Sequence, residues 1–269
     1  MKTIGTLERG NYTGPYFVVI DNEDKTREEY EKQFGDRVVM FDKKKYADQT
    51  DEGNNFDDRR TTTHARNACF DLAEKLGYRY FLVLDDDYTA FSYRTNSKQQ
   101  YPRFIKMVRK LDRLFEIVLQ FYESTPADCI ALAQGGDFIG GGFSSSNHYV
   151  NGRIKRKVMN SFFCCTDRRF QFVSQLNEDV NTYVALGKIG YLFMTIPLAS
   201  LNQAQTQSLA SGMTDAYLKY GTYVKSFYTV MYNPAACKIS TIGHAALRIH
   251  HQVNWLYAVP QIVSESLRK

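Results

Sequence analysis

Three consecutive carboxylates, Asp85, Asp86 and Asp87, follow an apolar run in "YFLVLDDDYTAF", residues 80–91. Adjacent carboxylates at the end of a buried strand repel one another unless a cation or strong hydrogen-bond donors offset their charge. Mg²⁺ and Mn²⁺ accept carboxylate oxygens and keep waters or substrate phosphates in their other positions. Because alternate strand residues point the same way, we expect Asp85 and Asp87 to share one side. The alternative is that the aspartates only cap the turn that follows.

Basic side chains are concentrated in two segments in the middle of a chain whose net charge is +5: "NGRIKRK", residues 151–157, and "DRRF", residues 167–170. Clustered Lys and Arg neutralise phosphates and release counterions, which favours a nucleic acid or nucleotide ligand. The alternative is a solvated surface loop. The residues predicted to contact DNA are Arg153, Lys155, Arg156, Lys157, Arg168 and Arg169.

Composition restricts the class of protein. The 269 residues are 43% hydrophobic and 14% aromatic, enough for one large domain with a full core. The apolar run at residues 191–199 is far shorter than the roughly 20 residues that span a bilayer. The first ten residues lack the apolar segment of a signal peptide, so we expect a cytoplasmic protein with no membrane partner. Five cysteines, two of them adjacent, favour reduced thiols.

The first half alternates strand and helix patterns. We predict a strand at 15–22, a helix at 26–35 closed by Gly35, and a strand at 37–42. After a polar loop at 43–60, a second helix begins at the threonines 61–63 and ends at Gly77, directly before the strand that carries the aspartates. This order predicts a largely parallel sheet.

The second half is less regular. It predicts a helix at about 103–122, a strand within 128–134, a glycine-rich stretch at 134–143 and a hairpin between residues 237 and 253. The predicted fold is α/β, a Rossmann-like, mostly parallel sheet flanked by helices, with a smaller irregular α+β half. We expect one domain over 1–269, in which about 15–134 bind a nucleotide sugar and about 135–269 bind the acceptor. The site then lies at the carboxyl ends of the strands.

The order of these features resembles the GT-A glycosyltransferases. The resemblance rests on the βαβ half, the Arg66–Asn67 pair on the helix, and the apolar strand that ends in D-x-D. It implies a UDP-sugar donor and a Mn²⁺ or Mg²⁺ cofactor, with Asp87 as metal ligand and Asp85 beside the donor. Asp85 is also a candidate metal ligand. The remaining donor-binding residues that the resemblance implies are Asp21, Arg66, Asn67 and Asp86.

The resemblance also implies an acidic pair at a helix N-terminus below the acceptor. Glu178 and Asp179 in "LNEDVNTYVALGKIG" fit this place, with Asn177 as the cap. Asp179 would accept the proton of the attacking hydroxyl, and the alternative for the pair is a capping box. A C-terminal histidine often completes the metal site, and His250 and His251 are both open as that ligand. On a strand the two histidines would face opposite ways.

A closer resemblance is to the TET-associated glycosyltransferases of bacteriophages, which add sugars to 5-hydroxymethylated pyrimidines in DNA. It rests on "EDVN" and on the tail "HHQVNWLYAVPQI", and it extends from about residue 17 to 262. It implies hydroxymethylated DNA as acceptor, with cytosine and uracil both open as the base, and the cytoplasm of an infected host cell as the place. The glycine-rich stretch predicts Gly135, Gly136 and Asp137 beside the sugar, because glycine lets the backbone approach a ligand closely, and the alternative is a simple flexible turn.

Three other functions are open at this point. The same chemistry could act on a protein or polysaccharide acceptor. The aspartates could serve a metal-dependent nuclease or nucleotidyltransferase, and product analysis separates these because a nuclease shortens DNA whereas a transferase makes it heavier. Finally, the chain could be a DNA-binding module without activity, which would not bind UDP in a metal-dependent way.

Overall fold

A computed structural model of the chain describes residues 1–54, 58–94, 106–134, 157–203, 223–242 and 247–259. Its N-terminal part contains the predicted strand–helix–strand unit: β1 (Val18–Asp21), α2 (Arg27–Phe34) and β2 (Val38–Phe41). β1 and β2 pair in parallel, and Gly35 ends α2 with a φ of 55°, a value that favours glycine. The prediction of this unit is confirmed.

The larger sheet differs from the prediction. Its six strands lie in the order β3 (Tyr80–Leu84), β7 (Ser161–Cys165), β6 (Cys129–Ala133), β8 (Phe193–Gln203), β4 (Tyr88–Tyr93) and β5 (Lys106–Met107). Only β6 and β8 pair in parallel, and the other four described pairings are antiparallel. The expected mostly parallel sheet is therefore wrong. Two parallel neighbouring strands need a connection of a dozen or more residues between them, usually a helix. The helix predicted before β3 offered such a connection from β2. However, β3 does not pair with β1 or β2 but with β7, which runs in the opposite direction.

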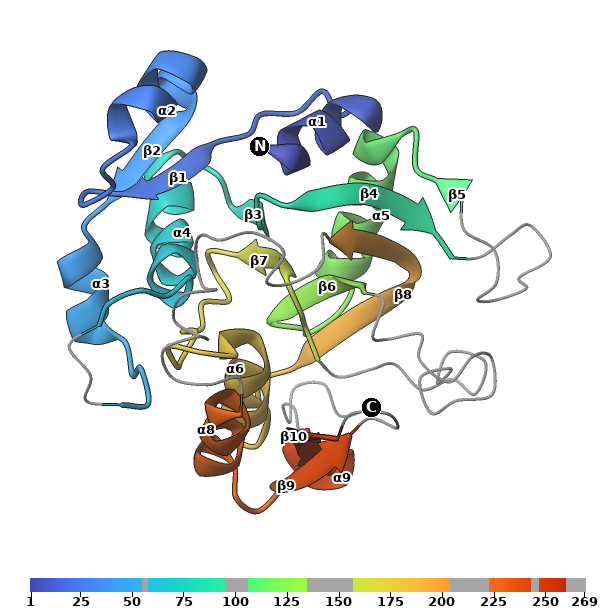
Figure 1. Cartoon of the computed structure of the whole chain (residues 1–269). Helices are drawn as coiled ribbons and strands as arrows, with labels where there is room; N and C mark the ends of the chain where they lie inside the picture. Colours follow the sequence, from blue (N-terminus) through green and yellow to red (C-terminus); the bar gives the residue numbers. More distant parts are fainter. Residues whose placement is uncertain (55–57, 95–105, 135–156, 204–222, 243–246, 260–269) are drawn as a thin grey trace.

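Helices cover both faces of this sheet (Figure 1). α4 (Thr63–Lys75) is confirmed, whereas α5 (Leu111–Glu123) begins later than the predicted residue 103 because 106–107 pair with β4 as β5. The backbone N–H of Leu111 donates to the carbonyl oxygen of Gly10, so a tertiary contact sets the start of α5. Two helices of the N-terminal half were not predicted: α1 (Lys2–Arg9), and α3 (Lys43–Gln49), which lies inside the expected loop.

The core has one apolar cluster on each face of the sheet. On the central strand β6, Ile130 and Leu132 belong to the cluster under α5, and Cys129 and Ala131 belong to the cluster under α6 (Glu178–Gly187). All five residues of β6 are buried. A strand covered on both faces needs apolar side chains in both directions, which explains the unbroken apolar sequence at 129–133.

The end of the described chain forms a C-terminal unit against α6. It contains α8 (Val224–Tyr232), the hairpin strands β9 (Cys237–Ile242) and β10 (Arg248–Val253), and the short helix α9 (Trp255–Ala258). β9 and β10 pair antiparallel, which confirms the predicted hairpin. Figure 1 shows this unit below α6, at the opposite end of the molecule from α1.

Candidate active site

The three aspartates form the turn between β3 and β4 rather than the end of a strand. β3 ends at Leu84, and Asp86 is exposed at the tip of the turn. The side-chain oxygen of Thr3, on α1, donates to the carbonyl oxygen of Asp85 at 2.6 Å, and the N–H of Thr3 donates to that of Asp86 at 3.1 Å. Because a turn does not alternate as a strand does, each aspartate has its own surroundings, and the expected sharing of sides does not apply.

Arg66 joins the aspartate turn to the acidic pair. Its side chain is buried, with one guanidinium nitrogen 3.0 Å from Oδ1 of Asp85 and another bonded to Oε1 of Glu178. The guanidinium carbon lies 4.7 Å from the ring centroid of Phe162. The hydroxyl of Thr62 also donates to Glu178, at 3.0 Å. One buried cation therefore holds together two carboxylates that the sequence separates by more than ninety residues, and this offsets their mutual repulsion.

The carboxyl group of Asp179 has different partners from that of Glu178, although the two residues are neighbours in the sequence. Its side chain is buried at the start of α6, and its Oδ1 accepts the N–H of Val180 at 2.7 Å. Burial, reinforced by the charge of Glu178, raises the pKa of Asp179 to about 6, against the opposing effect of Arg66. Glu178 has the ion pair with Arg66, so Asp179 is the carboxyl of the pair that is poised to take up a proton near neutral pH.

Asp87 has a buried oxygen that suits a metal ion. Its Oδ1 has no hydrogen-bond partner among the residues that the structure describes, and burial raises the pKa of this carboxyl. A buried carboxylate oxygen without a partner is costly unless a cation reaches it. The hydroxyl of Tyr88, the next residue, is also buried without a partner in the described part. Asp87 therefore fits Mg²⁺ or Mn²⁺, which need only one or two protein carboxylates.

The two histidines lie together on β10, in the C-terminal unit. Their ring centroids are 4.2 Å apart, so the rings pack on each other instead of facing opposite ways as predicted. Burial and the neighbouring His250 lower the pKa of His251 to about 3, which keeps its ring neutral as a metal ligand requires. Within the described ranges, no group of three or more His, Cys, Asp or Glu side chains is placed to hold a metal. A histidine ligand stays a prediction.

The other predicted donor residues have different positions. The amide of Asn67 is bonded to the backbone N–H and C=O of Phe172 at 2.7 and 3.0 Å, which gives this side chain a structural role. Asp21 lies at the end of β1 and pairs with Lys43 at 3.2 Å. Gly135, Gly136 and Asp137 lie outside the described residues.

Only three of the six residues predicted to contact DNA lie in the described part of the chain. Arg153, Lys155 and Arg156 lie outside the described residues. The guanidinium of Arg168 donates to the backbone carbonyls of Thr125 and Ala127, both at 2.9 Å, and so binds the chain just beyond α5. The remaining two have partners as well: Arg169 pairs with Asp71 and Glu74 of α4, and Nζ of Lys157 lies 3.5 Å from the sulfur of Met159.

A cavity of about 760 Å³ lies next to the aspartate turn, between β1 and β3. Its walls are mostly apolar, and its polar lining includes Arg66, Asp85 and Asp86. Pockets for small ligands have this size and this mixture of apolar walls with a few charged groups. Aromatic side chains at the cavity include Tyr12, Tyr16, Phe17 and Tyr78.

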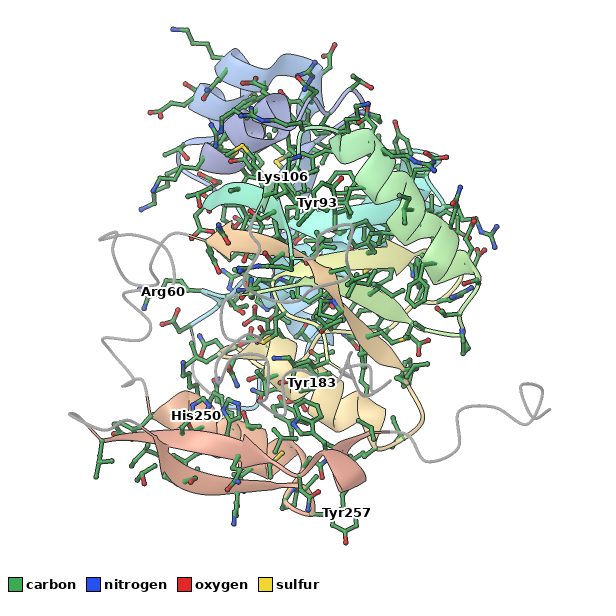
Figure 2. The ribbon with its side chains drawn as sticks, turned by 90° about the vertical axis from the view of Figure 1, so that its right-hand side faces the viewer. Arg60, Tyr93, Lys106, Tyr183, His250 and Tyr257 are labelled. Carbon is green, nitrogen blue, oxygen red and sulfur yellow. The ribbon has the colours of Figure 1, made fainter. Side chains whose placement is uncertain are left out.

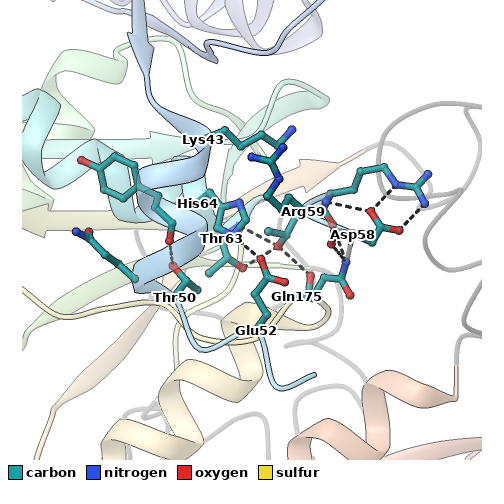
Figure 3. Close-up of polar contacts among 12 residues, drawn as sticks. Lys43, Thr50, Glu52, Asp58, Arg59, Thr63, His64 and Gln175 are labelled. Atoms are coloured by element: carbon teal, nitrogen blue, oxygen red, sulfur yellow. Dashed lines mark hydrogen bonds and ion pairs between the residues drawn. The ribbon is translucent and has the colours of Figure 1, made fainter. Parts of the chain in front are cut away.

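A polar network behind the site fixes the segment before Glu178 (Figure 3). His64, which is 1% exposed, pairs with Glu52 at 2.7 Å. The hydroxyl of Thr63 donates to the carbonyl of Ser174 at 2.6 Å, and the N–H of Gln175 donates to the carbonyl of Glu52 at 2.9 Å. Sequence reasoning missed these residues, because they lie in segments that look like ordinary polar loops and caps. The polar spacing gave no signal of their long-range partners.

Comparison with known families gives a match over the part of the chain that contains this site. The model of the family described as TET-Associated Glycosyltransferase matches residues 1–212, which include the aspartate turn, Arg66 and the acidic pair. No curated protein and no solved structure matches the chain. None of the described helices is long and apolar enough to cross a membrane. The chain belongs to the TET-associated glycosyltransferase family, and it is therefore a glycosyltransferase.

Proposed function

We propose that the protein transfers a sugar from a UDP-sugar to the hydroxymethyl group of 5-hydroxymethylcytosine or 5-hydroxymethyluracil in DNA, in the cytoplasm. The family match supports sugar transfer and a modified-DNA acceptor. The observation that carries the proposal is the contrast within the acidic pair: Arg66 neutralises Glu178, whereas burial raises the pKa of Asp179 to about 6.

Asp179 acts as the general base in this proposal. Its carboxylate takes the proton of the acceptor hydroxyl as the oxygen attacks the anomeric carbon of the sugar. The new carbon–oxygen bond forms while the bond from that carbon to the diphosphate breaks, and UDP leaves with the electron pair. A base with a pKa near 6 is mostly deprotonated at pH 7 to 8 and binds a proton more strongly than an ordinary aspartate.

The aspartate turn serves the donor. Asp87, whose buried Oδ1 has no hydrogen-bond partner among the described residues, would hold Mn²⁺ or Mg²⁺, assisted by the exposed Asp86. The bound ion would supply positive charge to the leaving diphosphate. Asp85 is held by Arg66, so we assign it to orient the donor.

The cavity between β1 and β3 is our proposed nucleotide pocket. Its aromatic and apolar walls suit the stacking of a pyrimidine ring. Three of its charged residues, Arg66, Asp85 and Asp86, adjoin the proposed metal ligand. The β1–α2–β2 unit, and the aspartate turn that follows the apolar strand β3, support a GT-A-like arrangement of this part.

Mass spectrometry of DNA after incubation with the protein tests this function. Duplex and single-stranded DNA containing either 5-hydroxymethylpyrimidine would be incubated with Mn²⁺ and a panel of UDP-sugars, with unmodified DNA as control. We expect a mass increase of one sugar residue on hydroxymethylated DNA alone. Shortened DNA would indicate a nuclease. Unchanged DNA together with a glycosylated protein or glycan would refute the proposed acceptor.

A further inference from the structure

Three side-chain amides lie at one edge of the large sheet, beside Asp87. β6 and β8 run in parallel, β7 runs antiparallel to β6, and β4 runs antiparallel to β8. The carboxyl ends of β6 and β8 therefore lie at the same edge as the amino ends of β7 and β4. Gln134 directly follows β6, Asn160 directly precedes β7, and Gln203 ends β8. Asp87 directly precedes β4. We call Gln134, Asn160 and Gln203 the amide cluster.

Hydrogen bonds connect the three members of the amide cluster. Nδ2 of Asn160 donates to Oε1 of Gln203 at 3.0 Å and to Oε1 of Gln134 at 3.4 Å. These bonds engage the nitrogen of Asn160 and, within the described part of the chain, leave its Oδ1 as an acceptor for a ligand. All three residues are half-buried, so a ligand can reach them.

The amide cluster is also joined to the proposed metal ligand. Gln203 is the strand partner of Tyr88, the residue that follows Asp87. Burial raises the pKa of the Asp87 carboxyl, and a hydrogen bond from the side chain of Gln203 partly opposes this rise. The sugar of a UDP-sugar is bonded directly to the diphosphate. A sugar whose diphosphate is held by a metal ion at Asp87 must therefore lie next to this carboxylate, which is where the amide cluster begins.

The backbone of Asn160 has an uncommon conformation. Its φ is 54°, in the left-handed region that asparagine tolerates better than most residues with a side chain. Such a conformation costs free energy, and it is frequent where a side chain must be held for a ligand. The neighbouring Ser161 fixes the start of β7, because its N–H donates to the carbonyl of Met159 at 2.8 Å and its Oγ accepts the N–H of Leu132 at 3.0 Å.

The C-terminal hairpin borders the segment that leads into β7. Figure 2 shows His250 on the side of the hairpin that faces the rest of the molecule. Burial and the charges of His250, Lys225 and Lys157 lower the pKa of His251. Lys157 precedes Asn160 by three residues. The hairpin therefore lies close to the chain that carries the central member of the amide cluster.

We propose that the amide cluster binds the hydroxyl groups of the donor's sugar and selects an uncharged hexose. The inference rests on the proposed function, because it names the residues that recognise the sugar of that donor. An amide has two N–H donors and an acceptor oxygen, and a hydroxyl both donates and accepts, so the two kinds of group match. Amides carry no charge, so they suit a hexose better than the carboxylate of a uronic acid. A site that bonds a hydroxyl rejects an analogue in which that hydroxyl is missing or misplaced.

Asn160→Gly tests the binding of the sugar with little effect on the backbone, because glycine readily adopts a φ of 54°. Asn11→Gly is the matched control, since Asn11 also has a φ of 54° and its amide donates to the carbonyl of Arg109, away from the amide cluster. Isothermal titration with Mn²⁺ would measure UDP, UDP-glucose and UDP-galactose. In Asn160→Gly the better-bound sugar nucleotide should bind about 5-fold more weakly, in keeping with one lost hydrogen bond, and UDP should change less than about 2-fold. The control should keep the wild-type ratio of the two affinities.

The selectivity among sugars is tested separately. Release of UDP in the presence of hydroxymethylated DNA would give kcat/KM for the two UDP-hexoses. The wild-type protein should prefer one of them by about 10-fold or more, and both Asn160→Gly and Gln134→Ala should reduce this preference. UDP-glucuronate should bind the wild-type protein about 10-fold more weakly than the preferred hexose does, because the amides offer its carboxylate no charge. Thermal melting checks that all variants remain folded.

The outcomes separate the sugar subsite from the proposed function. Three results would overturn the subsite. Unchanged sugar affinity and preference in Asn160→Gly would show that the amides only connect strand ends. An equal loss for UDP and for the UDP-hexose would show that they serve the metal or the diphosphate. An altered preference between 5-hydroxymethylcytosine and 5-hydroxymethyluracil, with unchanged sugar selectivity, would show that they bind the acceptor base. Absence of transfer to any DNA, with sugar binding that Asn160→Gly still weakens, would overturn the proposed acceptor and keep the subsite.

Discussion

Asp179→Asn should have opposite effects on activity and on stability. Asparagine keeps an oxygen for the N–H of Val180 but cannot accept the proton of the acceptor hydroxyl, so turnover should fall roughly 100-fold or more. Stability should instead rise at pH 8. The pKa of Asp179 is about 6 in the folded protein against 3.8 for an unperturbed aspartate, so ionisation above pH 6 costs the folded state. A difference of about two pKa units corresponds to about 3 kcal/mol as an upper estimate.

The sign of this effect depends on pH in a defined way. A folded-state pKa that is raised means that the folded protein holds the proton more strongly than the unfolded chain. The wild-type protein therefore loses stability as pH rises from about 4 to 6, whereas the asparagine side chain of the variant does not titrate. The stability gain of the variant should be full above pH 6 and should vanish below about pH 4. Urea unfolding at pH 4, 6 and 8 measures it.

Glu178→Gln is the matched control, because it changes the neighbouring carboxylate in the same way. This substitution removes an ion pair with the buried Arg66, so stability at pH 8 should fall. It also removes a negative charge that raises the pKa of Asp179, so the acid limb of the pH–activity profile should move below pH 6. If both substitutions destabilise the protein equally at pH 8 and Asp179→Asn keeps normal turnover, Asp179 is a helix cap and the reasoning is refuted.

Three further substitutions and one control test contacts of the site and of α6. Arg66→Met should destabilise the protein by about 3–5 kcal/mol in urea unfolding, because two carboxylates lose their buried partner. Arg79→Met, which breaks a solvent-exposed pair, should have little effect. Tyr88→Phe removes a buried hydroxyl that lacks a partner in the described part, and stability should stay equal or rise by about 1 kcal/mol; a clear loss would reveal a partner. Gly187→Ala should push α9 from α6 and shift the fluorescence of Trp255, the only tryptophan, to longer wavelength; unchanged emission would contradict the close contact.

Local patterns predicted the parts of the fold that depend on near neighbours in the sequence. The β1–α2–β2 unit, α4, α6 and the C-terminal hairpin follow from apolar periodicity, a closing glycine and turn residues. Sheet direction was not predictable in this way. It depends on which distant strand lies beside β3, and β7, about eighty residues later, takes that place in the antiparallel direction.

The same distinction applies to the site. The carboxylates clustered at residues 85–87 and 178–179 indicated the candidate site, and Arg66 was identified through a family resemblance. The structure brings these residues together. Asn67 was assigned to the donor through the same resemblance, and Arg168 was assigned to DNA because of its charge. Both bind backbone groups that sequence spacing does not reveal. Thr3 was missed because its partners, the carbonyls of Asp85 and Asp86, are more than eighty residues away.

The charge of the site leads to a last prediction, which is that the donor binds tightly only together with a divalent metal ion. Arg66 is the cation that contacts Asp85 and Glu178, while Asp86 is exposed and Asp87 has a buried oxygen without a described partner. A diphosphate brought to this turn meets carboxylates, and like charges at this distance raise its free energy. UDP should therefore bind weakly without a divalent ion and at least 10-fold more tightly with Mn²⁺.

Isothermal titration of UDP with Mn²⁺ or with EDTA measures this coupling. Asp87→Asn keeps the size of the side chain but removes its charge, and it should abolish most of the gain that Mn²⁺ gives while leaving the fold intact. Asp112→Asn provides a control, since Asp112 is a carboxylate of the same cavity whose oxygens are occupied by the N–H and hydroxyl of Thr13. The control should keep the full gain from Mn²⁺. Tight UDP binding in EDTA, or a full gain in Asp87→Asn, would show that the aspartate turn does not hold the metal, and the carboxylates would then need another cation.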